Sequence, residues 1–218
     1  MRLTPLTALT LALAGAFSQA QAAPYDWTVW SSNTSGTAGS VGVTFAGELS
    51  GIDPFFPDWL PTSSFADGSV VDNAPTSANR KLVLLGGGGA GAVIDTITFS
   101  TAVVNPVLSI WSLGQPGTPA TFEFAQTPTL VAGGSSNYFP GNAIVVTGNT
   151  VSGVEGNGTV QFIGTFTSLS WTNPIREDYY GFTVGVMQMQ APVPEPETYA
   201  LMLAGLAAVG FMARRRRT

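Results

Sequence analysis

The chain has 218 residues and a formal net charge of −5, and it contains neither cysteine nor histidine. These absences exclude disulfides, zinc sites built on Cys or His, and catalysis by Ser-His or Cys-His arrangements. Between residues 23 and 191, eleven acidic residues stand against three basic ones, a net charge of −8. This acidity argues against nucleic-acid binding through a basic patch.

The first 22 residues have the pattern of a secretory signal peptide. Arg2 supplies a positive charge, residues 6–17 form an apolar segment, and Ala20-Gln21-Ala22 is a small-residue cleavage pattern. We therefore expect a signal-peptide helix that engages the Sec translocon and is removed by signal peptidase after Ala22. Residues 23–191 then remain, which is enough for one domain with a sizeable core.

Short stretches of alternating apolar and polar residues, separated by turn residues, fill this domain, and no amphipathic helix pattern interrupts them. Strands are expected at 26–30, 41–47, 81–85, 93–100, 107–113, 121–125, 143–147, 150–154, 159–167 and 180–187. Gly148-Asn149 predicts a hairpin turn, and Trp111 is expected in the core. The pattern predicts an all-β domain, a single jelly-roll-like β-sandwich rather than an up-and-down barrel.

Residues 52–72 form the longest irregular stretch, and its many aromatic side chains predict a loop packed onto the body of the domain. Four carboxylates in and beside it are candidate calcium ligands: Asp53, Asp58, Asp67 and Asp72. Solvated loop carboxylates are the alternative, because the spacing of a calcium-binding loop is absent. Calcium is the only cofactor that the sequence suggests.

Two aromatic residues in loops, Trp59 and Tyr138, are candidates for stacking on the sugar rings of a polysaccharide. Packing of the loops themselves is the alternative explanation for both.

Residues 86–91 satisfy the dinucleotide-binding pattern G-x-G-x-x-G. The residues that follow alternate like a strand instead of opening a helix, so a surface loop is expected there and no nucleotide. A glycosidase needs only two carboxylates, and Glu123, Glu155, Asp95 or Asp72 could supply them, but no motif brings any two together. We therefore do not expect an enzyme.

The C-terminal segment, residues 192–218, has three parts in order: Pro194-Glu195-Pro196, an uncharged apolar run from Tyr199 to Ala213, and four arginines, Arg214, Arg215, Arg216 and Arg217. As a helix the apolar run reaches roughly 22 Å, which is shorter than a hydrocarbon core of about 30 Å. Snorkelling arginines and local thinning of the bilayer can make up the difference, so the run predicts a short transmembrane helix. The arginines are expected in the cytoplasm. The segment resembles the PEP-CTERM sorting signal.

That resemblance implies a substrate of an exosortase, a membrane protease-transpeptidase of Gram-negative bacteria that make extracellular polysaccharide. The precursor is then held transiently in the inner membrane, and the processed protein reaches the cell surface or extracellular matrix. We expect a structural, adhesive or polysaccharide-associated module. One alternative is a secreted carbohydrate-active enzyme with a carboxylate pair. Another is an envelope protein whose tail is an ordinary inner-membrane anchor.

Overall fold

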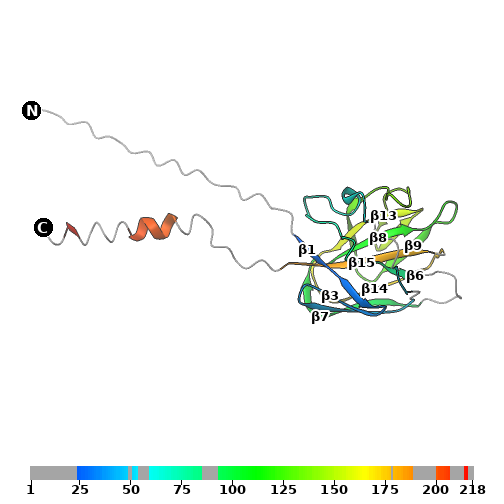
Figure 1. The fold of residues 1–218 in the computed structure, drawn as a ribbon, viewed down its shortest axis with the longest axis horizontal. Helices are drawn as coiled ribbons and strands as arrows, with labels where there is room; N and C mark the ends of the chain where they lie inside the picture. The colour runs from blue at the N-terminus through cyan, green and yellow to red at the C-terminus, as the bar shows by residue number, and fades with distance from the viewer. Residues whose placement is uncertain are drawn as a thin grey trace, which may run out of the picture.

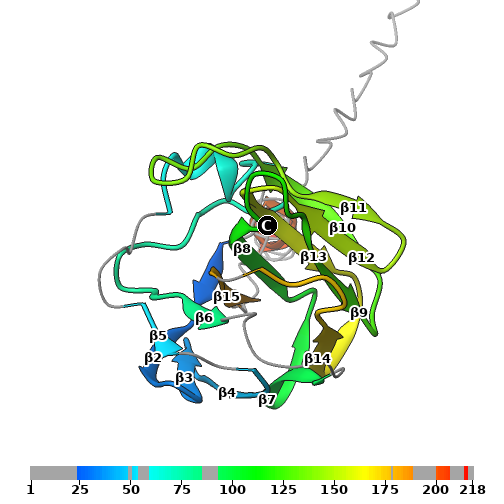
Figure 2. The ribbon, with the colours of Figure 1, turned by 90° about the vertical axis from the view of Figure 1, so that its right-hand side faces the viewer.

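The computed structural model describes residues 24–48, 51–53, 59–84, 93–177, 179–188, 200–206 and 214–215. Two antiparallel sheets face each other in the domain and form a β-sandwich (Figure 1). Figure 2 looks along the domain and shows β8, β15 and β6 of one sheet above β14, β7 and β4 of the other. This architecture confirms the predicted all-β sandwich.

The first sheet has seven strands. Its order is β10-β13-β8-β15-β6-β5, and β1 pairs with β15 beside this path. The strands are β1 (Tyr25–Trp27), β5 (Gly51–Ile52), β6 (Leu82–Leu84), β8 (Val107–Leu113), β10 (Pro128–Gly133), β13 (Gly156–Phe162) and β15 (Tyr180–Met187).

The second sheet has eight strands in the order β11-β12-β9-β14-β7-β4-β3-β2. The strands are β2 (Val29–Ser32), β3 (Ser35–Ala38), β4 (Val41–Ala46), β7 (Asp95–Val104), β9 (Ala120–Phe124), β11 (Val145–Thr147), β12 (Thr150–Gly153) and β14 (Thr165–Thr172). The predicted hairpin at Gly148-Asn149 joins β11 to β12, and Gly148 adopts the positive φ of 59° that such a turn requires.

The core between the sheets is built from alternate residues of facing strands, because successive side chains on a strand point to opposite faces. Phe45 and Trp171 from the eight-stranded sheet meet Phe182 from the seven-stranded sheet. The Trp171 and Phe182 ring centroids lie 5.0 Å apart in an edge-to-face contact, a favoured geometry for aromatic pairs. This aromatic core gives the domain its hydrophobic stability without disulfides.

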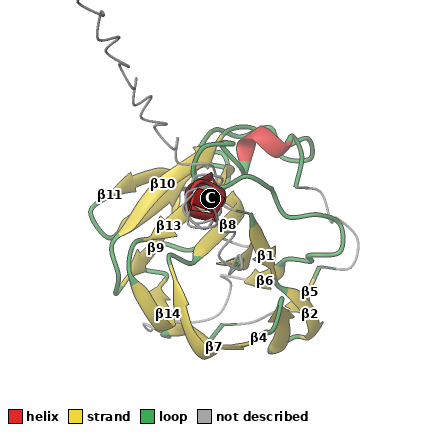
Figure 3. Cartoon of the chain, turned by 90° about the vertical axis from the view of Figure 1, so that its left-hand side faces the viewer, coloured by secondary structure: helices red, strands yellow, loops and turns green. Residues whose placement is uncertain are grey.

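The outer face of the seven-stranded sheet is also covered. Irregular chain from Trp59 to Asn79, with the short 3₁₀ helix η1 (Thr62–Ser64), packs over β8 and β13 (Figure 3). Beneath it lies a second apolar cluster that includes Trp59, Phe65 and Trp111. The expectation that residues 52–72 pack onto the body is confirmed for residues 59–72, while residues 54–58 lie outside the described residues. Trp111, expected in the core, instead packs from β8 against this outer layer.

One predicted strand is wrong. Residues 159–167 do not form one strand, because β13 ends at Phe162 and β14 begins at Thr165 in the other sheet. The chain turns at Gly164, whose φ of 133° is available to glycine without strain. Ile163 beside it is 64% exposed. An apolar residue therefore lies in the turn itself, and the sequence shows no polar break between the two strands.

The two ends of the domain lie together. β1 pairs with β15, and the Gln188 amide donates to the Pro24 carbonyl oxygen at 3.1 Å. Of the predicted signal peptide and tail, residues 200–206 and 214–215 are described, and both stretches are helical. Among the described residues, no helix has the length and apolar character needed to cross a membrane. The remainder of both segments lies outside the described residues.

Candidate functional site

The most unusual side chain of the domain is Lys81, the single lysine of the chain. It directly precedes β6, where Leu82 and Leu84 point into the core between the sheets. Lys81 therefore points the other way, beneath the outer layer, and its side chain is fully buried. Lysine is almost never fully buried without a partner, so its surroundings define a site.

The Lys81 ammonium group lies between a carboxylate and two indole rings. Its Nζ atom is 3.6 Å from Oδ2 of Asp53, whose side chain is 2% exposed. The same nitrogen lies 4.1 Å from the ring centroid of Trp111 and 5.2 Å from that of Trp59. Burial of these groups strengthens the ion pair and both cation–π contacts relative to exposed sites.

The outer layer holds these rings in place. The Trp59 indole N–H donates to the Asn79 carbonyl oxygen at 2.7 Å, and Phe65 packs edge-on against the same ring at 5.1 Å. Phe139 and Tyr179 pack edge-on against Trp111. Both tryptophans are thus fixed by contacts that do not involve Lys81.

Tyr179 connects the aromatic cluster to the ion pair, because its hydroxyl is hydrogen-bonded to the Asp53 carboxylate. Burial, first of all, and then the charge and the hydrogen bond of Asp53 together raise the pKa of Tyr179 to about 12. The phenol therefore stays protonated at neutral pH and acts as a hydrogen-bond donor to Asp53.

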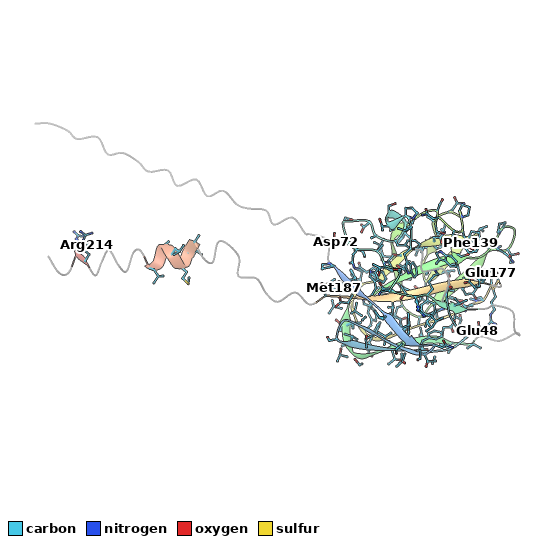
Figure 4. The ribbon with its side chains drawn as sticks, in the orientation of Figure 1. Glu48, Asp72, Phe139, Glu177, Met187 and Arg214 are labelled. Carbon is cyan, nitrogen blue, oxygen red and sulfur yellow. The ribbon has the colours of Figure 1, made fainter. Side chains whose placement is uncertain are left out.

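A second charged cluster lies at the end of the sandwich away from Met187, where Figure 4 labels Glu48 and Glu177. Arg176 pairs with Glu48 at 2.5 Å. Asp95, at the start of β7, is fully buried and accepts hydrogen bonds from the Glu48 amide at 2.7 Å and the Asn173 side-chain amide at 2.9 Å. The pKa of Asp95 is raised to about 7. Burial is the main cause and the Glu48 charge acts in the same direction, while both hydrogen bonds and the Arg176 charge lower the pKa.

The four predicted calcium ligands do not gather among the described residues. Asp53 pairs with Lys81. Asp67 accepts the amides of Ser69, Val70 and Val71 and so closes its own turn. Asp72 is exposed, and Asp58 lies outside the described residues. Within the described part of the chain, no three acidic side chains are grouped as metal ligands.

The two predicted sugar-stacking residues have different environments. Trp59 is 2% exposed beneath the outer layer, so the expectation that it offers an open stacking surface is corrected. The physical reason is its use in packing against Phe65 and in holding Lys81. Tyr138 is 47% exposed, and its ring contacts Phe139. Tyr138 therefore remains a candidate.

The four carboxylates considered for glycoside hydrolysis lie in separate places. Asp95 is fully buried, Glu155 accepts a hydrogen bond from the Ser112 hydroxyl at 2.7 Å, and Glu123 is an exposed residue of β9. Asp72 lies near the opposite end of the domain from Glu48, whose amide donates to Asp95 (Figure 4). The glycine run at 86–91 lies outside the described residues.

The outer face of the eight-stranded sheet carries mainly hydroxyl groups, a feature that the strand-by-strand sequence reading missed. Alternate residues of its strands point outward because their neighbours, such as Val43, Ile97 and Leu169, belong to the core. We call this surface the hydroxyl face. It consists of Ser35, Thr37, Thr44, Thr96, Thr98, Ser100, Thr121, Thr147, Thr150, Ser152, Thr165, Thr167, Ser168, Ser170 and Thr172.

The strand register aligns these hydroxyls into rows. Thr44, Thr98 and Ser168 are direct cross-strand partners on β4, β7 and β14. Adjacent strands lie about 4.8 Å apart, so such a row repeats at that spacing. Glu123 is the only charged side chain of this face among the described residues. The charges of the domain therefore lie largely elsewhere.

The fold and these surfaces define a class of protein: a two-sheet antiparallel β-sandwich with a covered outer face, internal charge pairs and one open hydroxyl-bearing face. Residues 192–217 match the PEP-CTERM protein-sorting motif. This match confirms the sequence-based interpretation of the C-terminal segment: the chain carries a bacterial sorting signal for export through an exosortase-type system. No curated protein and no solved structure gave a significant match.

Proposed function

We propose that this chain is a non-catalytic surface or extracellular-matrix module that associates with neutral polysaccharide through the hydroxyl face. The sorting motif supplies the destination, because exosortase-type sorting carries proteins to the bacterial cell surface. The observation that supports the ligand class is the row of Thr44, Thr98 and Ser168 on an open sheet. Hydroxyl groups both donate and accept, as the hydroxyls of a sugar chain do.

The chemistry of this face favours an extended polymer over a short sugar. A hydrogen bond to a sugar replaces one to water, so each contributes only about 0.5–1.5 kcal/mol. Several rows must act together to hold a ligand, as in multivalent binding. The near absence of charge on the face favours a neutral polymer, since the domain is otherwise acidic and repels polyanions.

The test is co-sedimentation with insoluble polysaccharide. Chitin and microcrystalline cellulose serve as neutral probes, and alginate beads serve as an anionic probe. We expect binding to at least one neutral probe, and we expect Thr98→Lys to weaken that binding at least tenfold by placing a bulky charge within the row. Thr129→Lys is the matched control, because Thr129 is an exposed threonine on β10 of the other sheet.

The stacking candidate Tyr138 is tested in the same assay. Tyr138→Ala weakens binding if the aromatic ring contributes to it, and leaves it unchanged if the hydroxyl face acts alone. Absence of binding to every neutral probe would overturn the proposed ligand class. Release of reducing sugar that is abolished by Asp95→Asn or Glu48→Gln would favour the alternative of a carbohydrate-active enzyme.

We propose further that the mature protein lacks both terminal segments. Signal peptidase removes residues 1–22 after Sec-dependent export, and an exosortase processes the tail near Pro194-Glu195-Pro196 while the precursor is held in the inner membrane of a Gram-negative cell. Mass spectrometry of the surface fraction is expected to find no peptide from residues 199–218. An intact C-terminus on surface material would instead support an ordinary membrane anchor.

A further inference from the structure

Lys81 and Asp53 are placed for a reaction with each other as well as for an ion pair. Ile52 pairs with Leu82 in the β5–β6 ladder, and the Asp53 amide donates to the Lys81 carbonyl oxygen at 3.1 Å. The two residues are therefore direct cross-strand neighbours. Their side chains lie on the same buried face, with Nζ and Oδ2 3.6 Å apart.

We propose that Lys81 and Asp53 form an intramolecular isopeptide bond, with the Tyr179 hydroxyl as the group that assists the reaction. Proton transfer within the buried pair gives an amine and a carboxylic acid. Nζ then attacks Cγ of Asp53, the new C–N bond forms, and one C–O bond breaks. The departing oxygen leaves with two protons as one molecule of water, so neither an oxidant nor any other reactant is needed.

Burial is the first reason for the reaction to occur at this pair. In water, an ammonium group and a carboxylate are both strongly solvated in their unreactive charged forms. Here the Lys81 side chain is fully buried and that of Asp53 is 2% exposed. Burial excludes the water that would otherwise solvate both groups, so the proton transfer that precedes the attack loses less solvation free energy here than in water. A desolvated lysine amine is a recognised nucleophile in proteins.

The groups around the pair match the charges that develop during the attack. Nitrogen becomes positive in the tetrahedral intermediate, and the rings of Trp111 and Trp59 lie 4.1 Å and 5.2 Å from it. The carboxyl oxygen becomes negative, and the Tyr179 hydroxyl is already hydrogen-bonded to that carboxyl group. The same hydroxyl can pass a proton to the departing oxygen and regain one from nitrogen.

The bond would close the segment between Asp53 and Lys81, which forms most of the outer layer over β8 and β13. Cross-linking two residues across a long segment restricts the unfolded chain. A chain without cysteine has no disulfide for this purpose. The proposal is independent of polysaccharide binding and of exosortase processing.

The test uses the fact that Lys81 is the only lysine of the chain. The purified full chain is denatured and treated with an amine-acylating reagent, and its intact mass is recorded before and after. With the bond formed, the mass is lower than the sequence mass by one water, and one label is added at the N-terminal amine alone. Trypsin then fails to cut after Lys81, and the fragment ending at Arg80 stays joined to the following one.

Three variants sharpen the result. Asp53→Ala is expected to have the full sequence mass and to accept two labels. Asp53→Asn is expected to form the same amide with loss of ammonia. Tyr179→Phe is expected to raise the unlinked fraction of freshly purified protein several-fold, while Tyr138→Phe, a neighbouring tyrosine, leaves it unchanged. Wild-type protein with the full sequence mass and two labels would overturn the proposal.

Discussion

The buried carboxyl group of Asp95 should make the stability of the domain depend on pH. Its pKa is about 7 in the folded protein, against 3.8 for an unperturbed aspartate, and burial is the main cause. The folded state therefore holds this proton over a range in which the unfolded chain has lost it. The free energy of unfolding should fall as pH rises from 4 to 7, and Asp95→Asn should remove this contribution.

The size of the Asp95 contribution to the free energy of unfolding follows from its pKa shift. A shift of about three pKa units at about 1.36 kcal/mol each gives a stability difference of about 4 kcal/mol over the full titration range, and about 3 kcal/mol of it falls between pH 4 and pH 7. The asparagine amide can still accept from the Glu48 amide, but its NH₂ group faces the donor of Asn173. That conflict costs the same free energy at every pH, so it cancels when the two pH values are compared.

The assay is urea-induced unfolding of wild type and Asp95→Asn at pH 4, 5.5 and 7. The variant should gain about 3 kcal/mol relative to wild type between the first and last pH, because other titrating groups are common to both proteins. Parallel stability curves for the two proteins across this range would refute the assignment of a raised pKa to Asp95. A relative loss by the variant at pH 7 would refute the sign of the effect.

Two further substitutions test the packing. Phe182→Ala removes a fully buried ring that contacts Trp171 and Phe45, so unfolding in urea should show a loss of about 3–5 kcal/mol; a loss below 1 kcal/mol would contradict the described core. Tyr25→Phe removes a hydroxyl that donates to the Asn105 carbonyl oxygen and accepts from Gln161, leaving two polar groups unpaired. A loss of about 1–3 kcal/mol is expected in the same assay, and unchanged stability would show that water replaces both bonds.

Much of the fold could be predicted from alternation along the chain. Phe182, Val184 and Val186 were expected to share one face of a strand, and all three lie in the core. The error at 159–167 has a simple origin. Val160, Phe162 and Phe166 share the same parity, so a turn of two residues between strands leaves the pattern uninterrupted. Local periodicity cannot reveal that the chain has crossed to the opposite sheet.

The buried ion pair shows the limit of local reasoning more clearly. Asp53 suggested a calcium ligand and Trp59 a sugar platform, because each was considered within its own loop. Lys81 directly precedes Leu82, which points into the core. By alternation, Lys81 lies on the opposite face of the sheet, which normally faces solvent. The pairing of β5 with β6 places Asp53 beside Lys81, and the packing of residues 59–79 over that sheet adds Trp59 to the pair. By contrast, the sorting signal is read directly from sequence, since all its parts are contiguous.

The pairing of β1 with β15 has a mechanical consequence. The chain leaves the domain toward its tail at Gln188, directly after β15. β15 is not an edge strand, because β8, β6 and β1 pair along it. Tension applied at Gln188 would therefore pull β15 lengthwise and load the hydrogen bonds on both sides at once, instead of peeling them one by one. A domain tethered through this end should therefore resist unfolding by a pulling force at its attachment point.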